Sequence, residues 1–317
     1  MSISRTCILA LLSLAPLATR ADTYVFLLVG QSNMSGRGLV SQSTFTPDAR
    51  IESYGDGLFG TTPGIQEATD YLRHDYGTTQ TNGTLNSTAV GPGGAFADAL
   101  LPTLGPSDKI LLVNRAWGGT ATSLWLPTAT AKPASPYPSG SGTLYNQALT
   151  DFYAAMTAVT NAGETAHVGG ILWHQGETDA DNINQSRTET LATYHANTIT
   201  ILDGFRDAID AHFGLGDNAT KIVMGQIGQF YANGNGTGGD VRAEEQIIAT
   251  EIGAGFANSV GLTDKGDATH FNSASQGQLG QRMESAYVAA VPEPSALGLT
   301  GMGAFALGAL TRRRRVV

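Results

Sequence analysis

Continuous apolar runs alternate along the chain with segments whose apolar residues recur at helical spacing. The apolar runs cover 24–29, 109–113, 168–173 and 222–227, and the helical patterns cover 95–101, 144–162, 188–213, 241–252 and 275–289. A run that is apolar at every position, rather than at every second one, predicts a strand that helices cover on both faces. Because such strands alternate with helices, the pattern predicts an α/β fold, a three-layer α/β/α sandwich with a mostly parallel central sheet.

The first 21 residues have the pattern of a secretory signal peptide. Arg5 precedes an apolar run from Cys7 to Ala18, and small residues lead to an expected cut near Ala21. A buried first helix would need a polar face, which this run lacks. We therefore expect the protein to be exported.

The last 27 residues have the pattern of a second targeting signal. Val291-Pro292-Glu293-Pro294 is followed by an uncharged stretch, 295–310, and by four arginines, 312–315. This order resembles the PEP-CTERM sorting signal of Gram-negative bacteria. The resemblance implies processing by a membrane-embedded, exosortase-type enzyme and a location in the cell envelope or outside the cell. A plain membrane anchor is the alternative, because arginines after an apolar stretch also stop transfer. Membrane contact is expected only through the two terminal segments.

Residues 22–290, between these ends, are long enough for one α/β domain with a single core. The chain has 18 Lys and Arg against 27 Asp and Glu, a net charge of −9, and six of the arginines lie in the two ends. This acidity disfavours nucleic acid as a partner but not a neutral polysaccharide. The single cysteine, Cys7, lies in the predicted signal peptide. The mature chain is therefore expected to have no disulfide and no thiol nucleophile.

Ser32 stands directly after the first predicted strand, in Gly30-Gln31-Ser32-Asn33-Met34. Ligands bind beyond the carboxyl ends of parallel strands, so this is where a nucleophile would act, although a serine there is often only a helix N-cap. The motif is not the Gly-x-Ser-x-Gly of α/β hydrolases. Nor is Gly36-Arg37-Gly38 a dinucleotide-binding loop, because Ser41 stands where its third glycine would be.

The Gly30–Met34 motif resembles the first block of the SGNH hydrolases, in the form used by carbohydrate esterase family 6 and sialate O-acetylesterase-like proteins. Further blocks follow in that family's order, at 91–97, 117–120, 173–179 and 267–271. The block at 91–97 departs from the family at Gly93, where a glutamate is common. The resemblance spans about residues 24–288, and it implies a flavodoxin-like SGNH fold and a serine esterase that needs no cofactor and no metal.

This resemblance assigns roles to individual residues. Ser32 is the expected nucleophile and His270 the general base. The backbone N–H groups of Ser32 and Gly119, with the side-chain amide of Gln175, form the expected oxyanion hole. Two carboxylates compete to orient the histidine: Asp267, three residues earlier and favoured here, and Glu177, which some family 6 enzymes are thought to use.

Three further expectations concern neighbouring side chains. Asp179 is expected to bond loop backbone. Trp125 and Trp173 either stack on sugar rings or pack in the core. His174 and Glu177 lie three residues apart, but the second half of a helical metal-ligand set is missing, so no metal site is predicted.

The predicted function is hydrolysis of O-acetyl esters on a polysaccharide, acetylxylan foremost, through an acetyl-enzyme on Ser32. A sialate O-acetylesterase is the nearest alternative. The alternative of another class is a non-catalytic surface or matrix protein that binds carbohydrate, which the sorting tail and the sequons at Asn82, Asn86 and Asn218 favour. A glycosidase would need paired carboxylates and would leave Ser32 and Gln175 without a role.

Overall fold

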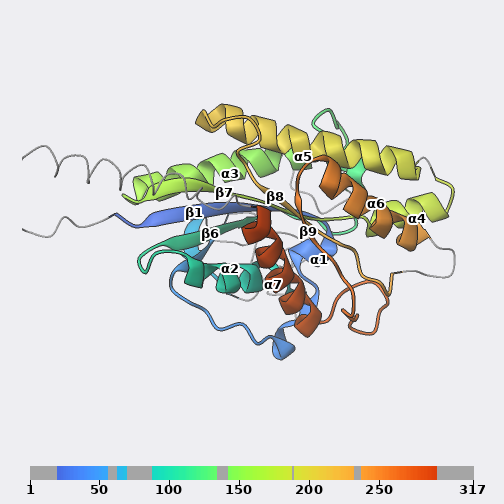
Figure 1. The fold of residues 1–317 in the computed structure, drawn as a ribbon, viewed down its shortest axis with the longest axis horizontal. Coiled ribbons are helices and arrows are strands. Elements are labelled where there is room, and N and C mark those ends of the chain that lie inside the picture. The colour runs from blue at the N-terminus through green and yellow to red at the C-terminus, as the bar shows by residue number, and fades with distance from the viewer. Residues whose placement is uncertain are drawn as a thin grey trace, which may run out of the picture.

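The computed structural model describes residues 20–55, 63–69, 88–133, 142–187, 189–231 and 237–290. The predicted sorting tail and nearly all of the predicted signal peptide lie outside these residues. A seven-stranded sheet in the order β4-β3-β6-β1-β7-β8-β9 forms the centre of the described part (Figure 1). Its strands are β1 (Asp22–Gly30), β3 (Ile51–Gly55), β4 (Gly64–Glu67), β6 (Lys109–Asn114), β7 (Thr165–His174), β8 (Ile222–Gly225) and β9 (Gly255–Ala257). Only β4 runs antiparallel to its neighbour.

Helices cover both faces of this sheet (Figure 1). One layer contains α3 (Leu144–Asn161), α4 (Glu177–Asn184), α5 (Leu191–Phe213) and α6 (Thr237–Glu251), and the other contains α2 (Gly93–Leu100) and α7 (Ser273–Ala290). The predicted three-layer α/β/α fold with a mostly parallel sheet is confirmed. None of the helices in the described ranges is long and apolar enough to span a bilayer.

Strand β1 shows why its sequence is apolar at every position. Val25, Leu27 and Val29 belong to the core cluster under α3 and α5, whereas Phe26 and Leu28 belong to the cluster under α2 and α7. All five side chains are fully buried. Successive strand residues point to opposite faces, so a central strand needs apolar residues on both.

Several short elements were not predicted. They include β3, β4, β9, α4 and the one-turn helix α1 (Ser32–Ser35), and a separate antiparallel pair formed by β2 (Gly38–Leu39) and β5 (Thr88–Val90). The long predicted helix 188–213 is in fact α5, which begins at Leu191. Thr190 and Thr193 cap it reciprocally. Helix α6 begins at Thr237, four residues before the predicted helix 241–252.

Gly30 lets the carboxyl ends of β1 and β7 approach closely. Its φ is +130°, and a Cβ added there would lie 2.0 Å from the carbonyl oxygen of His174. The N–H of Gln31 donates to that same oxygen at 2.9 Å. Only glycine fits such a backbone contact. The two strands therefore bring the segments that begin at Ser32 and at Gln175 side by side.

Candidate active site

Ser32 is the first residue of α1, at the carboxyl end of the central strand, and it is 6% exposed. The segment after β6 lies against it, because the N–H of Trp117 donates to the carbonyl of Gly30 at 2.8 Å. A Cβ added to Gly118 would lie 3.4 Å from Cβ of Ser32 and 2.4 Å from Nη2 of Arg37. The Trp-Gly-Gly-Thr turn at 117–120 therefore forms one wall beside the Ser32 hydroxyl.

His270 and Asp267 complete a hydrogen-bonded line with Ser32. Nε2 of His270 lies 3.1 Å from Oγ of Ser32, and Nδ1 lies 2.7 Å from Oδ2 of Asp267. The His270 ring is 22% exposed and the Asp267 side chain 37% exposed, so the line runs from a buried serine to a carboxylate at the surface. Three residues that the sequence assigned to one site are thus adjacent in space.

Asp267 is held as a carboxylate. Desolvation raises the pKa of this group, but the hydrogen bonds from the His270 ring and from the backbone N–H groups of His270 and Thr269 outweigh it. The net effect holds the pKa of Asp267 well below its ordinary value. Nζ of Lys265, 3.4 Å from Oδ2, adds a positive charge on the solvent side.

Glu177, the other candidate for the orienting acid, does not contact the His270 ring. It begins α4, is 1% exposed, and its Oε1 accepts from Nδ2 of Asn33 at 2.5 Å. Nδ1 of His174 lies 3.8 Å from the same oxygen. Burial raises the pKa of Glu177. Among the described residues, the carboxylate that contacts the His270 ring is Asp267.

The expected oxyanion role of Gln175 does not fit its contacts. Its Nε2 donates to the carbonyl of Thr120 at 3.0 Å and to Oδ2 of Asp179, so both N–H bonds of the amide are used inside the protein. The residue is 1% exposed. A glutamine side chain is long enough to reach back to the turn that follows Gly119, and there it braces that turn.

Gly119, by contrast, stands at an opening. It is exposed, its φ is +73°, and a Cβ added to it would meet no atom within 4 Å. The turn that carries it is tied at Thr120, whose Oγ1 donates to the carbonyl of Trp117 at 2.7 Å and accepts from Nε1 of Trp125 at 3.0 Å. Open space thus lies beside Gly119, on a turn whose shape is fixed by these internal bonds.

Asp179 also stabilises the turn that carries Gly119, and it bonds loop backbone as predicted. Its carboxylate accepts from the N–H of Thr122 at 3.1 Å and from Oγ1 of Thr122 at 2.6 Å, in addition to Nε2 of Gln175. Burial raises the pKa of Asp179 to about 7, against the opposing effect of these donors. The contacts are internal, which agrees with a structural role.

Trp125 and Trp173 pack in the core. Both are fully buried, and their rings meet edge to face with centroids 5.9 Å apart. Stacking on a sugar ring would require an exposed face, so of the two alternatives for these residues core packing is the one that the structure shows.

Sequence reasoning missed Asn33, which is fully buried next to the nucleophile. Besides Glu177, its Nδ2 donates to the carbonyl of Thr269 at 3.2 Å. Its Oδ1 accepts from the N–H of Phe271 at 3.1 Å and from Nε2 of Gln276 at 3.3 Å. The available signal was a short polar residue directly after Ser32, inside the Gly-Gln-Ser-Asn-Met block.

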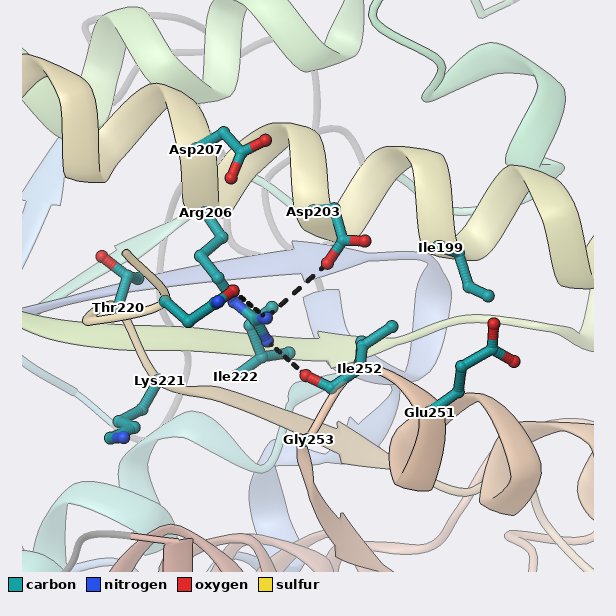
Figure 2. Close-up of a pocket in the computed structure, with 11 residues that line it drawn as sticks. Ile199, Asp203, Arg206, Asp207, Thr220, Lys221, Ile222, Glu251, Ile252 and Gly253 are labelled. Carbon is teal, nitrogen blue, oxygen red and sulfur yellow. Dashed lines mark hydrogen bonds and ion pairs between the residues drawn. The ribbon is translucent and has the colours of Figure 1, made fainter. Parts of the chain in front are cut away.

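A cavity of about 610 Å³ lies at the amino end of β8, whereas Ser32 lies at the carboxyl end of β1 (Figure 2). Arg206 of α5 reaches across it, and its guanidinium donates to the carbonyl of Ile252 at 2.9 Å and to Oδ1 of Asn218 at 2.8 Å. Oδ1 of Asp203 lies 3.6 Å from Nη1 of Arg206. These internal bonds tie α5 to the turn after α6, and the cavity is remote from Ser32.

Residues 22–289 match the family model described as carbohydrate esterase, sialic acid-specific acetylesterase. The chain belongs to this family. It is therefore a carboxylic ester hydrolase of the carbohydrate acetylesterase type. The match covers every block described above, from Ser32 to His270.

Solved structures share the fold of this esterase. A protein from Arabidopsis thaliana is 23% identical with a TM-score of 0.61, over 86% of this chain and 99% of its own. NanS is 18% identical with a TM-score of 0.60, over 86% and 98%. A carbohydrate acetylesterase from Xanthomonas citri is 18% identical with a TM-score of 0.54, over 84% of this chain and 55% of its own. A comparison with curated proteins gave no significant match.

Proposed function

We propose that this esterase removes O-acetyl groups from a polysaccharide, acetylxylan foremost, through an acetyl-enzyme on Ser32. The observation that carries the proposal is the hydrogen-bonded line from Ser32 through His270 to Asp267, at 3.1 and 2.7 Å. A base within hydrogen-bond reach of a hydroxyl, itself oriented by a carboxylate, is the arrangement that activates a serine nucleophile.

In the first half of the reaction, Oγ of Ser32 attacks the acetyl carbonyl while its proton passes to Nε2 of His270. The charge that develops on the carbonyl oxygen is stabilised by the N–H groups of Ser32 and Gly119. Asp267 accepts from Nδ1–H and stabilises the imidazolium. The tetrahedral intermediate then collapses, the bond to the sugar oxygen breaks, and His270 returns the proton to that oxygen.

In the second half, water replaces the sugar. His270 takes a proton from the water, the hydroxide oxygen attacks the acetyl carbon, and the second tetrahedral intermediate expels Oγ of Ser32 as the proton returns to it. Acetate leaves and the enzyme is restored. The exposed position of Gly119 supports this sequence, because both an alcohol product and a water need access to the same side of Ser32.

A neutral polysaccharide suits the charge of the chain. With a net charge of −9, the protein repels anionic polymers at long range, whereas a neutral backbone such as xylan is unaffected. The description of the matching family favours a second candidate, an O-acetylated sialic acid. A sialoside carries a carboxylate, so the two candidates differ in charge as well as in sugar.

Acetate release tests the proposal. The purified protein and its Ser32→Ala variant are incubated with acetylxylan, with O-acetylated sialic acid and with an aryl acetate. We expect release from acetylxylan that requires Ser32, and labelling of Ser32 by a fluorophosphonate. Equal release by the variant would sink the serine mechanism, and release from the sialic acid alone would transfer the assignment to the second candidate. A non-catalytic carbohydrate-binding protein would show neither release nor labelling.

We propose further that the chain is exported to the cell envelope or the medium of a Gram-negative bacterium, that the first 21 residues are removed, and that an exosortase-type enzyme processes the tail at 291–317. The basis is the order of apolar and charged residues at the two ends. Mass spectrometry of the protein recovered from envelope and medium would identify both mature termini. Recovery of an unprocessed chain from the cytoplasm would contradict this proposal.

A further inference from the structure

The side chain of Asn33 holds the chain on both sides of the catalytic histidine. Its Nδ2 donates to the carbonyl of Thr269 at 3.2 Å, and its Oδ1 accepts from the N–H of Phe271 at 3.1 Å. Thr269 and Phe271 are the residues immediately before and after His270. Asn33 directly follows Ser32 in the chain. Its side-chain amide thus sets the distance between the nucleophile and the base.

Glu177 determines which way that amide faces. Its Oε1 accepts from Nδ2 of Asn33, and a carboxylate only accepts hydrogen bonds. A reversed Asn33 amide would set Oδ1 against this carboxylate and would turn Nδ2 toward the N–H of Phe271, so that like groups would meet at both ends. Nε2 of Gln276, a donor from α7, adds to the preference for Oδ1 on that side.

The histidine loop needs such support because its two catalytic side chains are partly exposed. The His270 ring and the Asp267 side chain are 22% and 37% exposed, whereas Asn33 is fully buried and Glu177 is 1% exposed. The loop also contains Ala268 at a φ of +56°, a conformation that residues with a Cβ rarely adopt. A buried contact is the part of this assembly that water cannot replace.

We propose that Asn33 and Glu177 are positioning residues: Glu177 orients the Asn33 amide, and that amide holds His270 within hydrogen-bond reach of Ser32. The inference rests on the proposed function, since it assigns these residues to the Ser32 and His270 reaction. A misplacement of about 1 Å costs roughly 10²-fold in rate. The role differs from that of a triad acid, because Glu177 acts through Asn33 and does not touch the imidazole.

Replacement of Glu177 by its amide separates these two roles. In Glu177→Gln, Oε1 can still accept from Nδ2 of Asn33, but the new amide can also donate and fixes the Asn33 amide less firmly, so kcat should fall only by roughly threefold. A triad acid replaced by its amide loses roughly 10⁴-fold, because the neutral partner favours the wrong tautomer of the histidine. Glu177→Met, of similar length but with no acceptor, should lose at least about tenfold in kcat.

Asn33→Ala tests the amide itself. We expect kcat to fall by roughly 10²-fold while KM changes by less than about twofold, since no substrate contact is lost. The matched control is Asn114→Ala. Asn114 is also a buried asparagine, and it donates to the carbonyl of Met34 at 3.5 Å and accepts from the N–H of Ala116 at 3.2 Å. Its loss should lower the melting temperature without changing kcat per working site.

The experiment measures the pre-steady-state burst of an aryl acetate, which counts working sites, together with kcat and KM for each variant. The expected result is a reduced kcat per working site in Asn33→Ala, a kcat near the wild type in Asn114→Ala, and a smaller loss in Glu177→Gln than in Glu177→Met. Unchanged kcat in Asn33→Ala would overturn the inference, as would a loss in Glu177→Gln as large as that in Asp267→Asn. If Asn33→Ala does not fold, the contrast between Glu177→Gln and Glu177→Met decides. A wild type that releases no acetate would instead overturn the proposed function itself.

Discussion

Oγ of Ser32 and Nε2 of His270 lie 3.1 Å apart, although the two residues are separated by 238 positions in the chain. The central strand β1 delivers the serine to the carboxyl edge of the sheet, and the loop before α7 delivers the histidine to the same edge. The short distance therefore depends on how α7 packs against α2 and the sheet, as well as on the two residues themselves.

Asp267→Asn should reduce kcat by up to about 10⁴-fold, because the amide cannot stabilise the imidazolium and favours the wrong ring tautomer. Steady-state hydrolysis of an aryl acetate measures the loss. The control is Asp264→Asn in the same loop, whose carboxylate accepts from the N–H groups of Gly266 and Ala268 but does not contact the ring. Equal losses in the two variants would show that loop structure, and not the contact with His270, is responsible.

His174 should make the protein less stable as the pH falls from about 6.5 to about 4. Burial lowers the pKa of His174 from 6.5 to about 4, so in this window the unfolded chain binds a proton that the folded protein does not. The destabilisation begins below pH 6.5, reaches at most about 3 kcal/mol, and grows no further below the folded-state pKa. Urea unfolding at pH 7, 5.5 and 4 measures it. In His174→Asn the decline should be shallower, and an unchanged slope would contradict the assignment.

Two glycines of α7 should respond oppositely to alanine. A Cβ on Gly280 would lie 2.3 Å from the carbonyl oxygen of Pro92, so Gly280→Ala should cost about 1–3 kcal/mol by pushing α7 away from α2. A Cβ on Gly277, one turn earlier, meets nothing within 4 Å, and Gly277→Ala should gain up to about 1 kcal/mol in helix propensity. Urea unfolding of the two variants gives both values. Similar effects at the two positions would mean that the α2–α7 contact is not as close as described.

Gln175→Ala and Asp179→Asn should behave alike. Both loosen the turn that carries Gly119, so we expect each to lose about 1–3 kcal/mol of stability and no more than about tenfold in kcat. A direct oxyanion donor would cost about 10²–10³-fold when removed. Glu189→Gln is the control, because Glu189 binds Ser123 and Asn182 next to this turn without touching Thr120 or Thr122. A loss near 10³-fold in Gln175→Ala alone would restore the donor role.

The centre of the fold could be predicted from the sequence because its strands are continuous apolar runs that alternate with helical patterns. The apolar runs of β1, β6 and β7 follow from burial on both faces, and their order with the helices implies parallel pairing. The place of Ser32 at the carboxyl end of the first strand follows from this pattern, whereas its role as nucleophile came from the family resemblance. The edge strand β4 has no buried residue, and its neighbour β3 is buried only at Ile51 and Gly55. Neither strand contains such a run, so their sequences do not differ from loops.

The details of the site depended on distances that spacing along the chain does not contain. Asp267 and Glu177 are both acids in matching blocks, and only the fold shows which of them faces Nδ1 of His270. Gln175 fits the block pattern of a donor, yet its amide is bound to Thr120 and Asp179. Asn33 was hidden because its four partners come from three different segments of the chain.

The place of β1 in the sheet has a consequence for folding kinetics. This strand is made first, yet its two neighbours, β6 and β7, begin at Lys109 and Thr165. Strand β1 therefore has no strand to pair with, and its apolar side chains stay exposed, until distant parts of the chain are available. Sheets built from such non-local pairings fold slowly, and the waiting strand is open to association with other chains. We expect refolding from urea to take seconds or longer and its yield to fall steeply as protein concentration rises.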